Sequence, residues 1–146
     1  MKDCVVMKKI MNYMMTGILL LSFLLTGCGK TEPQTGKKMS MYYINTAETK
    51  VEVHEQYLNT KTPEEQVDET MRYLSTTPEK LEYKAPLDIG FQVLDYEVED
   101  GKLLINVNKA YSELSPTTEV LVRAAIVRTL TQLPNVKYVG ITVEDS

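Results

Sequence analysis

Residues 91–108 read FQVLDYEVEDGKLLINVN, and this stretch contains the strongest fold signal in the chain. Asp100-Gly101 favours a two-residue β-turn, so strands are expected on both sides of it. The turn brings apolar residues together on one face, namely Val98 with Leu103, Tyr96 with Ile105 and Leu94 with Val107. The opposite face is largely polar and pairs Glu99 with Lys102, Glu97 with Leu104 and Asp95 with Asn106. The prediction is a hairpin with one buried face, because a slip of one residue would bury charges.

A long helix is expected after this hairpin, from Pro116 to Leu133. Ser115 offers an N-cap hydroxyl, a proline suits the first helical turn, and Pro134 ends the helix. The apolar residues fall on two adjoining arcs, one made of Val120, Ala124 and Val127 and the other of Val122, Ile126, Leu130 and Leu133. A helix with so wide an apolar surface contacts more than one neighbour. We expect one arc to meet the sheet and the other to meet the first helix; the alternative is that part of this surface meets a partner protein.

The first helix is expected to begin at residues 62–65, which read TPEE. This tetrapeptide combines an N-cap hydroxyl, a proline at the first helical position and a glutamate that completes a capping box. Val67, Met71 and Leu74 then follow at helical spacing. They give the helix a narrow apolar stripe that faces the core.

The remaining strands complete an α+β pattern. Segments 41–44, 51–58 and 136–143 alternate or run apolar over strand lengths. The order is therefore β(β)–α–β–β–α–β. A strand that follows a helix returns to the sheet by a crossover, which places helices on a face of the sheet. The predicted fold is a two-layer α+β sandwich, with an antiparallel or mixed sheet of roughly three to five strands and both helices on one face.

Composition excludes several classes of function. The chain has 146 residues, which suits one ordinary domain. Its formal net charge of −4 argues against nucleic acid as a partner, because phosphate binding needs clustered lysine and arginine. A single histidine and two cysteines leave few ligands for a metal site and little thiol chemistry.

The N-terminal residues are typical of a targeting segment. Lysines precede an apolar run at 14–25. As a helix this run would extend about 18 Å, which is short of the hydrocarbon core of about 30 Å. The segment is therefore interpreted as a signal peptide covering residues 1–27.

The sequence LTGC at residues 25–28 resembles a bacterial lipobox. The resemblance implies that Cys28 carries a diacylglycerol and a fatty acyl chain such as palmitate, and that it becomes the first residue after cleavage. No other cofactor is expected. The alternative is an ordinary signal peptide that leaves a free cysteine. In the lipoprotein interpretation, residues 28–38 are a lipidated tether. Residues 39–146 are the folded domain, which lies on the extracytoplasmic face of a bacterial cell membrane.

No set of residues in the sequence points to catalysis or to a metal site. The sequence shows no nucleophile that would pair with His54, so His54 is interpreted as a solvated residue on a surface strand. Glu97, Glu99 and Asp100 lack the spacing of a calcium loop and are interpreted as a solvated strand edge. Arg123 interrupts the apolar surface of the long helix. It is expected to lie on the surface with a packed stem or, alternatively, to contact a partner.

Arg128 interrupts the apolar surface of the same helix. It is likewise expected to lie on the surface with a packed stem or, alternatively, to contact a partner. With Arg123 it forms the candidate partner-binding pair.

The segment 126–139 reads IVRTLTQLPNVKYV, and with the acidic-Gly turn and the return strand it resembles the GerMN domain of sporulation and spore-germination lipoproteins. The resemblance covers about 41–143.

This resemblance implies a non-enzymatic domain similar to the ring-building modules of secretion systems. It implies that the lipid attaches the protein to the membrane. It also implies protein partners in a sporulation or envelope complex, and self-association is a further option. The protein after which the domain is named carries two copies, whereas this sequence shows one. An alternative is a lipoprotein that binds a cell-wall glycan or small ligand, or that regulates a wall enzyme. That alternative needs a concave site built from tyrosines, namely Tyr42, Tyr43, Tyr57, Tyr83 and Tyr96.

Overall fold

The computed structural model describes residues 36–77 and 82–144. The predicted signal peptide and Cys28 lie outside the described residues. The elements in chain order are β1 (Lys37–Asn45), β2 (Val51–Leu58), α2 (Pro63–Leu74), β3 (Tyr83–Lys84), β4 (Val93–Glu99), β5 (Lys102–Val107), the 3-10 helix η1 (Lys109–Glu113), α3 (Pro116–Leu130) and β6 (Tyr138–Val143). The first strand thus begins two residues before the domain start expected from the sequence.

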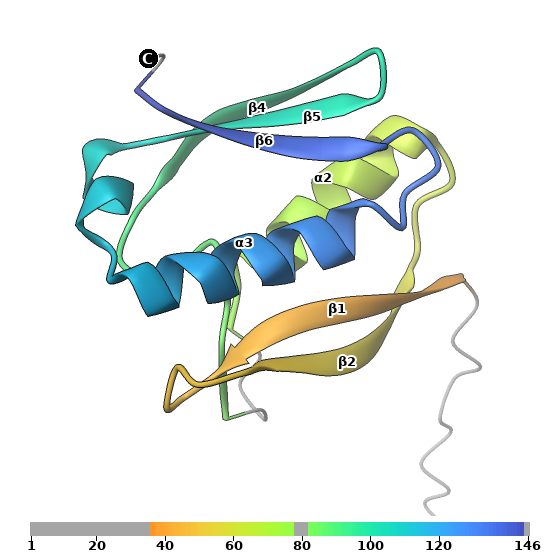
Figure 1. Cartoon of the computed structure of the whole chain (residues 1–146). Coiled ribbons are helices and arrows are strands. Elements are labelled where there is room, and N and C mark those ends of the chain that lie inside the picture. The colour runs from red at the N-terminus through yellow and green to blue at the C-terminus, as the bar shows by residue number, and fades with distance from the viewer. Residues whose placement is uncertain (1–35, 78–81, 145–146) are drawn as a thin grey trace, which may run out of the picture. The chain divides into compact units, whose positions relative to one another are not determined.

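The described strands form two sheets of three. One sheet has the order β2-β1-β3 and is antiparallel; the other has the order β4-β5-β6, with β4 antiparallel and β6 parallel to β5. Figure 1 shows α2 and α3 between the two sheets, and residues from both sheets and both helices share one core. The α+β class, the mixed pairing and the order of the longer elements are confirmed, whereas the short strand β3 and the 3-10 helix η1 were not expected. The structure differs from the expected single sheet in dividing the strands between two.

The reason for the division lies at the second edge of β1. The two-residue strand β3 covers the end of this edge at Ile44 and Asn45. Further along, the backbone N–H of Tyr42 donates to the hydroxyl of Thr129 over 3.0 Å. The amide of Gln132 accepts from the N–H of Ser40 and donates to its carbonyl, at 3.1 and 2.7 Å. Side chains at the end of α3 therefore take the place that another strand would occupy.

Replacing Thr129 by valine tests this edge contact. The hydroxyl of Thr129 is buried, accepts from β1 and donates to the carbonyl of Ala125 over 2.8 Å. Its loss leaves a β1 amide unpaired, so we expect Thr129→Val to lower the free energy of unfolding by about 1–3 kcal/mol. Chemical unfolding measures the change. The control is Thr131→Val at an exposed position, whose hydroxyl bonds only within the helix. Equal losses from the two variants would contradict the role of the edge contact.

The β4–β5 hairpin follows the predicted register except at its far end. The pairs Val98–Leu103 and Tyr96–Ile105 are confirmed, as are the three pairs of the polar face. The prediction that Leu94 opposes Val107 is wrong. Val93 takes that place, and the register shifts between Val93 and Asp95. An extra residue in one strand is a β-bulge, and it leaves Leu94 51% exposed. Both turn residues have positive φ, as a two-residue hairpin turn requires.

The start of α2 is confirmed in detail. Thr62 caps the helix, and its hydroxyl and the carboxylate of Glu65 form the reciprocal bonds of a capping box. Val67, Met71 and Leu74 are buried as expected. A feature that sequence patterns did not reveal is Glu69, which is also buried. Its carboxylate accepts hydrogen bonds from the residues that connect β2 to α2, so it ties this connection to the helix.

The environment of Glu69 predicts a pH-dependent stability. Burial raises the pKa of this carboxyl, but the hydroxyl of Thr60 and the backbone N–H groups of Asn59 and Thr60 outweigh burial and hold the pKa below its ordinary value. A lowered folded-state pKa stabilises the fold above the unfolded-state pKa, and this stabilisation is lost as the pH falls through the folded-state pKa.

We therefore expect Glu69→Gln to cost most stability at neutral pH and progressively less on acidification. Unfolding curves of the two chains between about pH 7 and about pH 3 measure the difference, since a free glutamate titrates at about 4.3. A difference that stays constant over this range would contradict the role of the ionised carboxylate.

Candidate functional site

The most distinctive surface of the described residues is one face of α3. The helix buries Val122, Ile126 and Leu130 against the core, as one of the two arcs was expected to do. The other arc is covered only in part, and Ala124 in it is half-buried. Val120 is 65% exposed and Val127 is 38% exposed. The expectation that both arcs are covered within the domain is therefore wrong, and the exposed arc with Ala124 is called the α3 stripe below.

Two arginines border the α3 stripe on opposite sides. Each residue of a helix advances about 100° around the axis. With Val120 at the centre, Arg123 falls on one flank and Arg128 falls on the other, and both are exposed. The residues that the sequence singled out as a candidate pair thus lie around one continuous helical surface.

Each arginine is held by neighbouring side chains. The guanidinium of Arg128 lies 4.2 Å from the ring centre of Tyr42 and donates to its hydroxyl over 3.4 Å. The guanidinium of Arg123 lies 5.7 Å from the ring centre of Tyr111 and donates to Glu119 over 3.0 Å. Stacking on aromatic rings restricts both long side chains while leaving their charged ends accessible. Each arginine therefore has defined neighbours on the surface of the domain.

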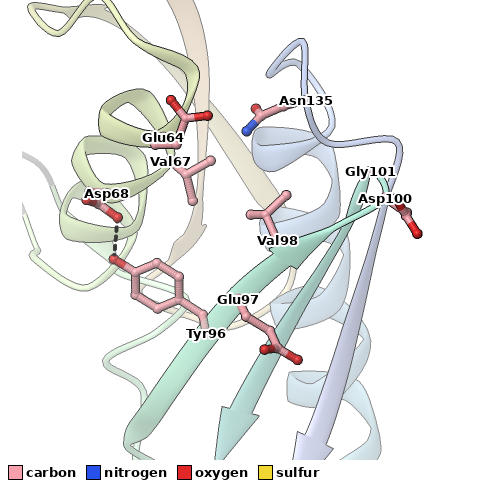
Figure 2. A pocket seen from close by; sticks show the side chains of 9 residues that line it. All are labelled: Glu64, Val67, Asp68, Tyr96, Glu97, Val98, Asp100, Gly101 and Asn135. Atoms are coloured by element: carbon pink, nitrogen blue, oxygen red, sulfur yellow. Dashed lines mark hydrogen bonds between the residues drawn. The ribbon is translucent and has the colours of Figure 1, made fainter.

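A second surface feature is a groove between α2 and β4, with a volume of about 420 Å³. Figure 2 shows Glu64 and Asp68 projecting from α2, and Val98 pointing from β4 into the space between them and Asn135. The hydroxyl of Tyr96 donates to Asp68 over 2.9 Å and closes one end. Burial of this hydroxyl, with its bond to Asp68, raises the pKa of Tyr96. The residues that line the groove are Glu64, Val67, Asp68, Tyr96, Glu97, Val98, Asp100, Gly101 and Asn135.

The structure does not bring the other candidate residues together as a catalytic or metal site. His54 lies in β2 opposite Met41. Glu97, Glu99 and Asp100 lie exposed along β4 and its turn. Within residues 36–77 and 82–144, no group of three or more histidine, cysteine, aspartate or glutamate side chains is placed to hold a metal ion.

The tyrosines that a ligand-binding alternative requires are dispersed. Tyr43 is buried and stacks with Tyr83 at a distance of 6.3 Å between ring centres. Tyr42 lies beneath Arg128, and Tyr57 is on β2. Of the five, Tyr96 is the one that lines the groove beside α2. The structure therefore provides no common tyrosine-lined concavity from these residues within the part of the chain it describes.

Sequence reasoning missed which arc of α3 would be exposed and missed the groove beside α2. The α3 arcs are both apolar, so helical periodicity contains no signal that ranks them. The groove depends on how α2 lies against β4, which no local pattern specifies.

Across the described residues, no helix combines the length and apolar character needed to cross a bilayer.

Comparison with known proteins gives a consistent result. The model of the Germane family, described as sporulation and spore germination, matches residues 40–146. The fold is similar to the first GerMN domain of the sporulation protein GerM from Bacillus subtilis, with a TM-score of 0.55 and 16% identity over 73% of this chain and 82% of that chain. It is also similar to the tandem GerMN domains of that protein, with a TM-score of 0.53 and 16% identity over 73% of this chain and 39% of that chain. No curated protein matches the chain. The resemblance noted from residues 126–139 is confirmed.

Proposed function

Because the chain belongs to the Germane family of sporulation and spore germination, we propose that it acts in a protein assembly of the bacterial cell envelope. In this proposal it is a non-enzymatic lipoprotein, anchored through Cys28 on the extracytoplasmic face of the membrane. We take its process to be sporulation or spore germination, and the description of the family supports this choice. The observation that carries the proposal is the α3 stripe, which lies exposed between Arg123 and Arg128.

The composition of this surface favours a protein partner. A single exposed valine is ordinary on a protein surface. Here Val120 and Val127 share one helical face, and an arginine stacked on a tyrosine stands on each side of it. Arginine and tyrosine are enriched in protein interfaces, where they surround an apolar centre. We infer that the partner presents an apolar patch bordered by carboxylates.

Charge reversal of the two arginines tests the proposal. We expect Arg123→Glu combined with Arg128→Glu to reduce recovery of partner proteins, because the reversed charges repel a carboxylate border. Thermal stability should change little, since both arginines are exposed and pairs of this kind contribute about 0–1 kcal/mol. The measurement is an affinity pull-down of the full-length protein from crosslinked membranes of growing and sporulating cells, with the melting temperature measured in parallel.

Lys61→Glu is the matched control, because it reverses an exposed charge outside α3. Recovery of the same proteins by the double variant and by wild type would show that the α3 stripe is not the contact. A large fall in melting temperature would show that the arginines serve the fold instead.

The ligand-binding alternative has a direct test of its own. A lipoprotein that binds a cell-wall glycan should melt at a higher temperature in the presence of wall fragments, because a ligand stabilises the state that binds it. The dispersed tyrosines provide no site of the required shape. We therefore expect no shift, and a saturable increase would favour this alternative.

A further inference from the structure

We propose that the open edge of β4 binds an extended, basic segment of a partner protein as an added strand, with lysine or arginine side chains of that segment in the groove beside α2. This surface is separate from the α3 stripe. The inference rests on the proposed function only in taking the partner to be a protein.

The edge of β4 offers unpaired backbone groups. Among the described strands, β4 ends its sheet and has β5 as its neighbour. Glu99 and Lys102 flank a two-residue turn and so exchange hydrogen bonds with each other, and this pattern alternates along the hairpin. The backbone N–H and C=O groups of Tyr96 and Val98 therefore point away from β5. An extended peptide pairs with groups of this kind.

The edge of β4 differs from that of β1. In β1 the second edge is occupied by β3 and by the side chains of Thr129 and Gln132. In β4, residues 97–99 are exposed, and no such cover comes from the part of the chain that the structure describes. The bulge at Leu94 limits the regular edge to the part beside the groove.

Charge determines which strand fits. The groove lining contains the carboxylates of Glu64, Asp68, Glu97 and Asp100 and contains no lysine or arginine. A second copy of β4 would bring Glu97 and Glu99 of one chain against those of the other, and like charges across strands are destabilising. A segment with lysine or arginine at alternate positions meets opposite charge instead. The surface is thus complementary to a basic strand and unfavourable for self-pairing through β4.

The groove also fits the shape of basic side chains. An added strand projects alternate side chains toward and away from the core. Those directed toward the core would pass over Val67 and Val98, which suit an aliphatic stem, and would reach Glu64 and Asp68 with their charged ends. Those directed outward would lie beside Glu97, which also lines the two hollows on the outer face of the sheet.

The test uses the full-length protein in detergent micelles and a labelled peptide of about nine alternating lysine and valine residues. We expect saturable binding by fluorescence anisotropy that weakens with added salt. Glu97→Lys should reduce the affinity about tenfold or more, because it inverts the charge at the centre of the edge. Glu113→Lys, at an exposed position of η1, is the matched control, and its affinity should stay within about twofold of wild type.

Two further measurements separate strand addition from adhesion of opposite charges. A peptide with N-methylated amides along both edges keeps its charge but cannot donate backbone hydrogen bonds to β4 from either edge, so it should not bind. Val98→Pro removes an N–H that the hairpin does not use, and it should abolish binding while the hairpin still folds. If Val98→Pro lowers the melting temperature markedly, the N-methylated peptide makes the same test on the unaltered protein.

Absence of saturable binding, equal binding of the N-methylated peptide, or undiminished binding by Glu97→Lys would each overturn the inference. The arginine variants of α3 distinguish this failure from failure of the proposed function. They should bind the peptide as wild type does. If peptide binding fails while those variants still lose their partners, the β4 inference is wrong and the proposed function stands.

Discussion

Ile126→Ala lowers the free energy of unfolding by about 2–5 kcal/mol, whereas Val127→Ala changes it by less than about 0.5 kcal/mol. These are the expected results for neighbouring residues on the two adjoining arcs of α3. Ile126 is fully buried in the core shared by the two sheets, so truncation leaves a cavity. Val127 is on the exposed α3 stripe and loses few contacts. Chemical unfolding of the two variants measures the difference directly.

The comparison has internal checks. Both changes introduce alanine in the same helix, so differences in helix propensity are small. Val120→Ala should repeat the result for Val127→Ala, because it is more exposed still. Similar losses at Ile126 and Val127 would mean that the stripe is packed against the domain, and the account of α3 would then be wrong.

Cys28→Ser is expected to move the protein from the membrane fraction to the soluble fraction. The lipobox-like sequence at 25–28 makes Cys28 the attachment point for acyl chains, and each buried CH₂ contributes about 0.8 kcal/mol to membrane binding. A chain with a net charge of −4 gains no attraction to anionic lipids, so nothing replaces the lost anchor.

Fractionation of cells and metabolic labelling with a fatty acid measure this effect. Wild type should incorporate the label and sediment with membranes, and Cys28→Ser should do neither. Cys4→Ser is the matched control, because Cys4 precedes the lipobox-like sequence and should not change either result. Membrane retention of an unlabelled Cys28→Ser protein would show that another segment anchors the chain.

The hairpin illustrates what a local pattern predicts well. Asp100-Gly101 defines the turn, and alternation then determines which residues face the core, because strand periodicity propagates from a fixed turn. Val98 was expected on the buried face and is 38% exposed. The prediction also fails at Leu94, where a bulge changes the register. Nothing in the alternation of residues 91–99 marks that position, since valine and leucine are adjacent there and either could face inward.

The number of sheets depends on contacts that no local pattern contains. The five longer strands were identified from the sequence, and the two-residue strand β3 was not. Whether β1 joins the hairpin depends on which groups occupy its second edge. Thr129 and Gln132 occupy it from the end of α3. Thr129 lies in the last turn of α3, and Gln132 lies just beyond its end at Leu130, three residues before the end expected from the sequence. Both are polar, so the apolar pattern of the helix gives no sign of their role. The family resemblance was carried by the same segment, 126–139, and the structure supplies a physical role for two of its residues.

The candidate site was predictable in part. Helical spacing placed Val120, Ala124 and Val127 on one arc, and Arg123 and Arg128 were identified as residues that interrupt the apolar surface. Which arc is exposed follows only from the packing of α3 against β1 and α2. The acidic residues of β4 were identified but interpreted as a solvated edge. The groove that makes them part of a surface arises from the position of α2 beside the strand.

The most direct test of the central claim, that α3 presents a partner-binding face, is photo-crosslinking in sporulating cells. A photoreactive residue replaces Val120 in one full-length chain and Val53, 55% exposed on β2, in the control. We predict a discrete crosslinked protein from position 120 that is lost when Arg128→Glu is added and is not obtained from position 53. No adduct at position 120, or the same adduct from both positions, would contradict the account.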